Sequence, residues 1–212
     1  MKTIKQTIIC YGDSNTYGFN PETLGRYKKK QRWTGILSDL LGNNFNVIEE
    51  GCNNRTGFYN NKEGYILSGA LYIKECLKTN PTADIFIFAL GTNDLQKLYN
   101  FNEQIIKNGL ENYLKTIKDK NPNTKIIIIS PIQLKKDIIN GSFRFLFSEN
   151  SIINSSKIRR IYKDFAAENN IELFVLDNIV SPSKTDGLHY SEKAHEIIAK
   201  NLSELILNNH TF

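Results

Sequence analysis

The chain has 212 residues and a net charge of +5, with 40% of its residues hydrophobic and 23% charged. This length and composition suit one globular domain with a substantial core. No apolar run approaches the ~18 residues of a membrane-spanning helix, and we expect no secretory leader at the N-terminus. The basic cluster at residues 28–32 stands among scattered charges of both signs, so we expect no nucleic-acid partner.

The cysteine pattern bears on the cellular compartment. The chain has three cysteines, Cys10, Cys52 and Cys76, an odd number without the spacing of a metal site or a redox pair. Disulfides are rare in reducing compartments. We therefore expect reduced thiols, a cytoplasmic location and no metal site.

Short β-branched and aromatic runs alternate along the chain with longer segments of helical periodicity. The predicted strands are residues 7–11, 45–48, 84–90, 125–130 and 171–176. The predicted helices are residues 33–41, 65–78, 103–120, 156–168 and 192–207. Residues 126–129 are all isoleucine, as in a strand covered on both faces. The alternation predicts one α/β domain over residues 1–212, with a parallel sheet covered by helices on both faces.

Two segments do not follow this alternation, residues 95–102 and 132–155, and we expect both to be loops. Long loops in compact domains often form lids or pocket walls. Their aromatic residues, Tyr99 and Phe145 among them, are therefore candidates for the wall of a site. Simple packing of these rings on the body of the domain is an equally good interpretation.

Polar residues follow four of the predicted strands at the carboxyl ends, the edge where open α/β sheets bind ligands. Ser14 follows the first strand, residues 51–56 the second and residues 91–94 the third, while Asp186 and His189 come after the fifth. A serine hydroxyl becomes a strong nucleophile when a histidine takes its proton and a carboxylate orients that histidine. We therefore predict a catalytic triad of Ser14, His189 and Asp186.

Attack on an ester carbonyl creates an oxyanion, which needs fixed hydrogen-bond donors. The candidate donors are the backbone N–H groups of Ser14 and Asn54 and the side-chain amide of Asn93. Taken singly, each of these motifs is better explained as a turn or a helix cap. Their order along the chain, each at the end of a strand, favours a site.

The candidates for the substrate pocket are Asp13, Cys52 and Leu95, which lie in or next to these motifs, and Tyr99 and Phe145 from the two loops. We also expect Asp13 and Asp94 to hold their loops by hydrogen bonds. His195 lies one turn into the last predicted helix and is expected to be exposed, and His210 lies in a tail, so neither is assigned to the site.

These residues together resemble the SGNH, or GDSL-type, hydrolase superfamily, named for a Ser, Gly, Asn and His in four blocks. Residues 12–14 (Gly-Asp-Ser), 91–94 (Gly-Thr-Asn-Asp) and 186–189 (Asp-Gly-Leu-His) match the first, third and last blocks. The resemblance is closer still to the arylesterase/acyltransferase branch and spans roughly residues 8–195. The segments that carry it are residues 32–35, 47–51, 55–56 and 90–94.

The resemblance implies a flavodoxin-like, three-layer α/β/α fold with a five-stranded sheet. It also implies a cofactor-free mechanism with an acyl-enzyme on Ser14, acyl transfer to alcohols or peroxide as well as to water, and a homo-oligomer. Much of the superfamily has a glycine as second oxyanion donor where this chain has Asn54. Asparagine tolerates left-handed backbone, so we expect the donor to be kept and the more crowded mouth to favour small acyl groups.

The first interpretation is therefore a serine esterase acting on small acyl esters, such as acetyl esters of alcohols, aryl compounds or sugars. A lysophospholipase or thioesterase is the alternative among enzymes, and Phe143, Phe145 and Phe147 could line its acyl channel. The non-catalytic alternative is a flavodoxin-like module that binds a nucleotide or phosphate. The chain has neither Gly-x-Gly-x-x-Gly nor the Walker lysine pattern, which disfavours the interpretation as a nucleotide- or phosphate-binding module.

Overall fold

The computed structural model describes residues 5–176 and 179–208. Within these residues, a five-stranded parallel sheet runs in the order β2-β1-β3-β4-β5. The strands are β1 Gln6–Gly12, β2 Phe45–Gly51, β3 Ile85–Ala89, β4 Lys125–Ile129 and β5 Glu172–Phe174. This order is that of the flavodoxin-like folds, so the predicted fold class is confirmed.

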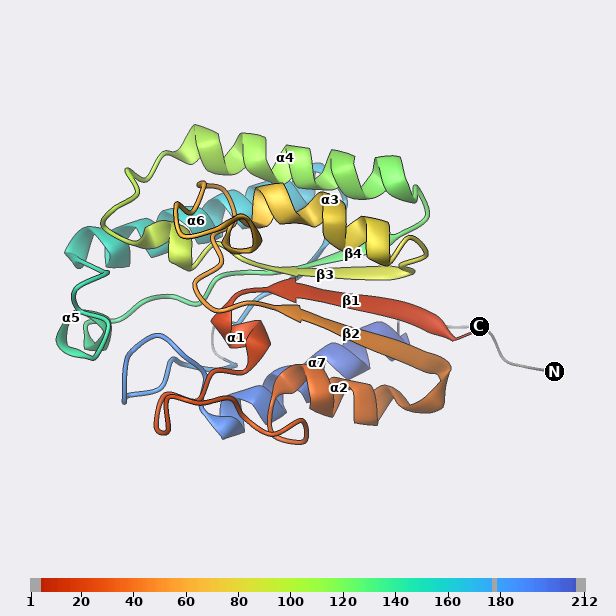
Figure 1. The fold of residues 1–212 in the computed structure, drawn as a ribbon, viewed down its shortest axis with the longest axis horizontal. Helices are drawn as coiled ribbons and strands as arrows, with labels where there is room; N and C mark the ends of the chain where they lie inside the picture. Colours follow the sequence, from red (N-terminus) through yellow and green to blue (C-terminus); the bar gives the residue numbers. More distant parts are fainter. Residues whose placement is uncertain (1–4, 177–178, 209–212) are drawn as a thin grey trace.

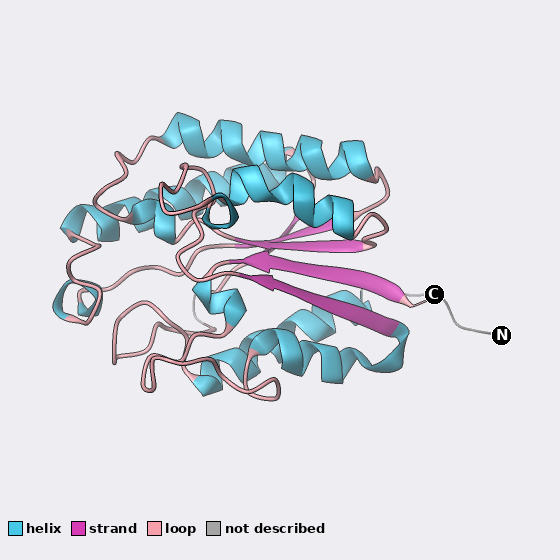
Figure 2. Cartoon of the chain, in the orientation of Figure 1, coloured by secondary structure: helices cyan, strands magenta, loops and turns pink. Residues whose placement is uncertain are grey.

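Helices cover both faces of the sheet and complete the three layers (Figure 1). On one face lie α2 Trp33–Leu41 and α7 Glu192–Asn208, and on the other lie α3 Gly69–Thr79, α4 Glu103–Lys120 and α6 Glu149–Glu168. Two short helices, α1 Ser14–Tyr17 and α5 Asp137–Asn140, lie beyond the carboxyl ends of the strands (Figure 2). Long loops therefore gather at that end of the sheet.

Burial of the central strands on both faces explains why their sequences are continuously apolar. Ile8, Ile9 and Phe86 on β1 and β3 have no exposed surface, because helices cover the sheet on both sides. Cys10 and Cys76 are also fully buried, as small core residues. Among the described residues, no helix combines the length and the apolar character needed to cross a lipid bilayer.

The structure differs from the sequence prediction around residues 132–155. Part of this expected loop is helical, because it contains α5 and because α6 begins at Glu149 rather than at residue 156. Ser148 and Ser151 form a capping box that starts α6. Serine and asparagine favour caps and turns, so this stretch looks like a loop in the sequence although it begins a helix.

The register of the strands brings the polar loops to one edge. Gly12 pairs with Gly51 on one side and with Ala89 on the other, so β1, β2 and β3 end level with one another. A Cβ atom at Gly51 would clash with the backbone of Tyr17. Glycine at this position therefore lets α1 pack directly on the end of β2.

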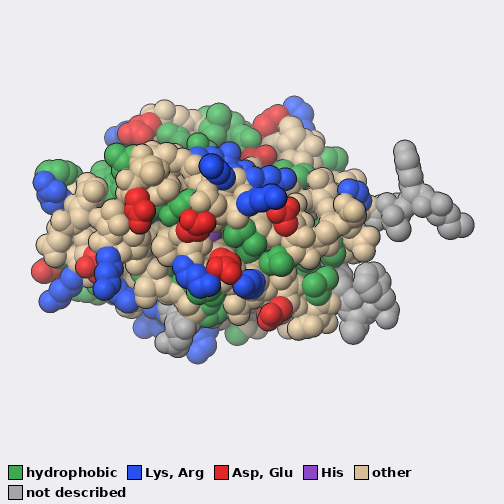
Figure 3. All heavy atoms as spheres, turned by 90° about the horizontal axis from the view of Figure 1, so that it is seen from below, with side chains coloured by type: hydrophobic (Ala, Val, Ile, Leu, Met, Phe, Trp, Pro, Cys, Tyr) green, Lys and Arg blue, Asp and Glu red, His purple; other side chains and the backbone are tan. Residues whose placement is uncertain are grey.

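The face of the molecule seen in Figure 3 lies on the side of α2 and α7. Lys and Arg side chains on this face are interspersed with Asp and Glu. One local cluster joins Glu49 to Arg26 and Arg32 at 2.9 and 2.6 Å. The charges on this face thus alternate in sign instead of forming a single basic patch.

Candidate active site

The turn that carries Ser14 is built by its own neighbours. Asp13 Oδ1 accepts the N–H of Asn15 at 2.9 Å, and the Asp13 carbonyl accepts the N–H groups of Thr16 and Tyr17. Asp13 is therefore the N-cap of α1, the short helix that begins with Ser14. Ser14 is 7% exposed and its Oγ points at the loop that carries His189. Asp13 thus acts as the loop-holding residue that the sequence analysis expected.

Asn15 joins this turn to the loop at the far end of the chain. Its Oδ1 accepts the N–H of Tyr190 at 3.0 Å, and its Nδ2 donates to the carbonyl of Leu188 at 3.4 Å. The indole N–H of Trp33 donates to the Asn15 carbonyl at 3.1 Å. Asn15 was not among the predicted site residues, because nothing local in the sequence reveals a hydrogen-bond partner so far along the chain.

Asp186 and His189 are held in one tight turn. Asp186 Oδ1 accepts the N–H groups of Leu188 and His189, each at 2.9 Å, while Oδ2 lies 2.7 Å from His189 Nδ1. Gly187 has φ +72°, and a Cβ there would clash with the backbone of Ile138. Glycine is therefore needed between the two residues for both conformation and space.

The charge of Asp186 is set by two opposing effects. Burial by itself would raise the pKa of this carboxyl, but its hydrogen bonds with His189 and Leu188 and the charge of His189 lower it below the ordinary value. Asp186 is therefore ionised at neutral pH and can only accept hydrogen bonds. This assigns the ring proton of neutral His189 to Nδ1 and leaves Nε2 as an acceptor.

His189 lies between Ser14 and two aromatic rings. Its Nε2 is 2.9 Å from Ser14 Oγ, within hydrogen-bond distance for proton transfer. The ring centroids of Phe19 and Phe143 lie 4.4 and 5.3 Å from the imidazole. These rings cover His189, which is 3% exposed, and so limit the access of water to the imidazole.

The two asparagines predicted as oxyanion donors, Asn54 and Asn93, line the same cavity as Ser14. Asn93, the first residue of the 3-10 helix Asn93–Leu95, donates from Nδ2 to the carbonyl of Arg55 at 3.0 Å. Asn54 has φ +60°, the left-handed conformation that asparagine tolerates. The loops after β2 and β3 therefore bring the two asparagines to the same edge of the sheet as Ser14.

Asp94 holds the loop after β2 against the loop after β3. Its carboxylate accepts the N–H groups of Gly57, Phe58 and Tyr59 at 2.7, 2.7 and 3.1 Å. Burial nevertheless raises the pKa of Asp94 to about 6, and burial likewise raises that of Asp13 to about 7. Asp94 thus holds its loop, as expected from the sequence.

Ser14 opens into a cavity of about 150 Å³. Polar groups from the loops after β2 and β3 form one side, and apolar groups form the other. The lining residues are Ser14, Phe19, Asn53, Asn54, Asn93, Gln96, Phe143, Leu146, Phe147, Leu188 and His189. The predicted nucleophile, base and both predicted asparagines thus share one cavity.

None of the five pocket candidates from the sequence lines this cavity. Asp13 lines a separate internal cavity of about 20 Å³, Leu95 is buried in the core, and Cys52 donates its N–H to the Gly12 carbonyl. Tyr99 stacks on Tyr59, with ring centroids 5.1 Å apart. Phe145 is 71% exposed, beneath the guanidinium of its neighbour Arg144.

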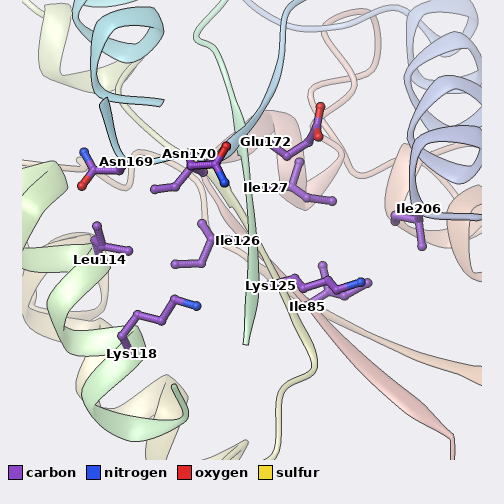
Figure 4. A pocket seen from close by; sticks show the side chains of 11 residues that line it. Ile85, Leu114, Lys118, Lys125, Ile126, Ile127, Asn169, Asn170, Glu172 and Ile206 are labelled. Carbon is purple, nitrogen blue, oxygen red and sulfur yellow. The ribbon is translucent and has the colours of Figure 1, made fainter. Parts of the chain in front are cut away.

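A larger cavity, of about 510 Å³, lies at the opposite end of the sheet (Figure 4). It is lined by residues at the amino ends of β3, β4 and β5, including Ile85, Ile126 and Glu172. Lys118 in its wall already donates to the carbonyls of Pro122 and Thr124. Size alone therefore does not identify the site, because the hydrogen-bonded pair of Ser14 and His189 lines the smaller cavity.

His195 corrects the sequence analysis, which expected it to be exposed. It has no exposed surface, and its Nδ1 accepts the N–H of Trp33 at 3.2 Å, at the start of α2. The rings of Tyr27 and Tyr190 meet it edge-on, with centroids 5.1 and 5.6 Å away. His195 thus connects α7 to α2 inside the core. His210 lies outside the described residues.

Solved structures of two esterases share the fold of this chain. The chain is similar to an aryl esterase of M. smegmatis in its inhibitor-bound form, with 27% identity, a TM-score of 0.87 and coverage of 96% of this chain and 99% of that one. It also shares its fold with Est24, a carbohydrate acetylesterase from Sinorhizobium meliloti, at 24% identity and a TM-score of 0.86, with 97% and 100% covered. A comparison with curated proteins found no match.

A family model covers almost all of the described chain. The model of the GDSL-like lipase/acylhydrolase family matches residues 8–202, from β1 into α7. This range includes the Ser14 turn, the Asn93 loop and the turn of Asp186 and His189. The chain therefore belongs to the GDSL-like lipase/acylhydrolase family and is a serine esterase.

Proposed function

We propose that the protein hydrolyses small acyl esters, such as acetyl esters of alcohols, aryl compounds or sugars. Ser14 is the nucleophile, His189 the base and Asp186 the carboxylate that orients the base. The observation that carries this proposal is the unbroken series Ser14 Oγ, His189 Nε2 and Asp186 Oδ2, with links of 2.9 and 2.7 Å, at the wall of a cavity.

The first half of the reaction forms the acyl-enzyme. His189 Nε2 takes the proton of the Ser14 hydroxyl as Oγ attacks the ester carbonyl carbon. The negative charge that develops on the carbonyl oxygen accepts hydrogen bonds from the backbone N–H groups of Ser14 and Asn54 and from Asn93 Nδ2. When the tetrahedral intermediate collapses, the C–O bond to the alcohol breaks and His189 returns the proton to the leaving oxygen.

The second half releases the acyl group. An acceptor, which is water in hydrolysis and an alcohol or peroxide in acyl transfer, gives its proton to His189 and attacks the acyl carbon of Ser14. The same donors stabilise the second oxyanion. The bond to Ser14 Oγ then breaks, His189 returns the proton to Oγ, and the free enzyme is restored. Asp186 stays ionised throughout and stabilises the charged imidazole.

The dimensions of the cavity support a short acyl group. Its volume of about 150 Å³ is below the roughly 300 Å³ at which pockets for drug-sized ligands begin. Asn54 and Gln96 occupy one wall, and Phe143 and Phe147 close the apolar wall. Phe145, which a long acyl channel would use, lies outside the cavity. These features favour an acetyl ester over the long acyl chain of a lysophospholipase or thioesterase.

The similar proteins support the choice of alcohol. One is an aryl esterase and another a carbohydrate acetylesterase, so aryl and sugar esters are the first substrates to test.

We also propose that the protein is a homo-oligomer and is located in the cytoplasm. The free thiols of Cys10, Cys52 and Cys76 are compatible with a reducing compartment. Light scattering and cell fractionation test these two properties.

The decisive experiment measures the intact mass after incubation with a fluorophosphonate. We expect one adduct on the wild type, none on Ser14→Ala and a much slower reaction of His189→Ala. Ser38→Ala, on α2 and outside the cavity, is the matched control and should react like the wild type. A wild type without an adduct, or a Ser14→Ala variant that still hydrolyses esters, would overturn the proposal.

A series of p-nitrophenyl esters then tests the acyl group. A maximum of kcat/KM at the acetyl to butyryl esters supports the proposal, because these acyl groups fit beside Asn54. A maximum at the octanoyl ester or longer would instead favour the lysophospholipase or thioesterase alternative.

A further inference from the structure

Gln96 lies directly after the 3-10 helix that carries Asn93, and it is 3% exposed in the wall of the Ser14 cavity. Its Nε2 donates to Asn54 Oδ1 at 2.9 Å and to Asn93 Oδ1 at 3.0 Å. A side-chain amide nitrogen carries two hydrogens, so these two bonds use the full donor capacity of Gln96 Nε2. One amide group therefore contacts both asparagines of the proposed oxyanion hole.

The bond from Gln96 decides which end of the Asn93 amide acts as donor. Asn93 Oδ1 accepts from Gln96, and Asn93 Nδ2 donates one hydrogen to the Arg55 carbonyl at 3.0 Å. The second hydrogen of Nδ2 is then left for an oxyanion. Rotation of the Asn93 amide by 180° would place its Nδ2 against Gln96 Nε2, two donors, and its Oδ1 against the Arg55 carbonyl, two acceptors. Gln96 and Arg55 together thus exclude the rotated form.

The bond to Asn54 acts on a residue in an uncommon conformation. Asn54 has φ +60°, and its backbone N–H direction depends on keeping this left-handed geometry. Gln96 holds its Oδ1, Glu63 accepts from its Nδ2 at 3.0 Å, and Asn61 donates to its carbonyl at 3.1 Å. Glu63 is exposed, whereas Gln96 and Asn61 are buried.

We infer that Gln96 is a positioning residue, which orients the Asn93 side chain and the Asn54 backbone for the oxyanion. This inference rests on the proposed function, since it assigns a role within that reaction. Gln96 itself does not contact the reacting atoms. Its effect passes through the two asparagines, so its loss should reduce stabilisation of the transition state more than binding of the ester.

Two variants test this role in p-nitrophenyl acetate hydrolysis. Gln96→Met keeps an unbranched side chain of similar length and removes both bonds, whereas Gln96→Glu keeps the shape but replaces the donor with an acceptor. We expect kcat to fall about 10- to 100-fold in Gln96→Met, with KM changed less than about 2-fold. The loss should be larger in Gln96→Glu, because its carboxylate repels both Oδ1 atoms and draws Asn93 Nδ2 away from the cavity.

A matched control comes from α4. Gln104 Nε2 also donates to an asparagine Oδ1, that of Asn108 at 2.7 Å, but it is exposed and outside the cavity. Gln104→Met should keep the kcat and KM of the wild type. Melting temperatures of all variants separate a general loss of stability from a loss of catalysis. Equal losses of kcat in the Gln104 and Gln96 variants would overturn the inference.

A double variant of Asn93 and Asn54 tests whether Gln96 acts through these two residues. In Asn93→Ala/Asn54→Gly neither Oδ1 remains, while glycine keeps the backbone donor and allows positive φ. Adding Gln96→Met to this background should change kcat less than about 2-fold, because coupled residues are not additive. A further loss as large as that in the wild type would refute the proposed route.

The outcomes also separate this inference from the proposed function. A wild type that hydrolyses the acetate, loses activity in Ser14→Ala and keeps its kcat in both Gln96 variants would overturn the inference alone. A loss seen only as raised KM would do the same. A wild type without esterase activity would overturn the proposed function and this inference together.

Discussion

The buried His195 makes the stability of the fold depend on pH. Its Nδ1 accepts the N–H of Trp33 at 3.2 Å, and a protonated ring would present a second donor to that group. Burial, followed by the charges of His189 and Arg32, lowers the pKa of His195 from 6.5 to about 3. The folded protein therefore holds this ring neutral under conditions in which the unfolded chain protonates it.

The size and sign of the effect follow from the two pKa values. The folded pKa of His195 is depressed, so the unfolded chain binds a proton below pH 6.5 and the folded chain binds it only near pH 3. Each unit by which the pH falls within this window lowers the free energy of unfolding by about 1.4 kcal/mol. Between pH 7 and pH 5 the contribution of His195 therefore falls by about 2 kcal/mol.

The variant His195→Asn isolates this contribution, because its Oδ1 can accept the Trp33 N–H and does not titrate. Asp13 and Asp94, whose pKa values burial raises to about 7 and about 6, stabilise the fold as the pH falls and act in the opposite direction. They titrate in both proteins and cancel in the difference. Urea unfolding followed by the fluorescence of Trp33, the single tryptophan, measures both free energies.

We expect the wild type to lose stability relative to His195→Asn as the pH is lowered from 7 to 5. A difference that stays constant within about 0.5 kcal/mol over this range would refute the reasoning. A wild type that gains stability relative to His195→Asn as the pH is lowered would contradict the sign of the effect. Urea titrations at pH 7, 6 and 5 are sufficient to distinguish these results.

Two further predictions concern the catalytic groups. Asp186→Asn should lower kcat about 10⁴-fold, because a neutral amide supports the wrong tautomer of His189 and does not stabilise its charged form. Steady-state hydrolysis of p-nitrophenyl acetate measures kcat, and a loss below about 10-fold would contradict the role of Asp186. Asn93→Ala should lower kcat about 10²- to 10³-fold and leave KM nearly unchanged, since the oxyanion forms on the way to the transition state. A loss in the same assay that is confined to KM would exclude Asn93 as an oxyanion donor.

The walls of the cavity were predicted from the sequence only in part, because Phe143 and Phe147, named there for an acyl channel, line it, whereas none of the five pocket candidates does. Some of the pocket candidates were chosen because they lie next to a motif in the sequence, as Leu95 follows the Asn93 motif, yet Leu95 is buried in the core. Phe19 and Phe143 reach the cavity from loops whose course depends on packing, and both contact the His189 ring. Local periodicity describes helices and strands but not the paths of the loops between them.

The position of His195 shows the same limit within a helix. Its place near the start of the last helix was predicted, but its burial was not. Whether that face is exposed depends on a neighbouring helix, and α2 covers it through Trp33. Hydrophobic periodicity does not mark a polar residue that is buried because it accepts one specific N–H group.

The sequence by itself determined the alternation of strands and helices, the parallel sheet, and the grouping of Ser14, Asn54, Asn93 and the Asp186 turn at one edge. These follow from local periodicity and from the fact that the carboxyl ends of parallel strands share an edge. Only the tertiary structure decided which groups hold these residues in place. Gln96 and its partner Asn54 come from different loops, and such bonds depend on distances that no local pattern encodes.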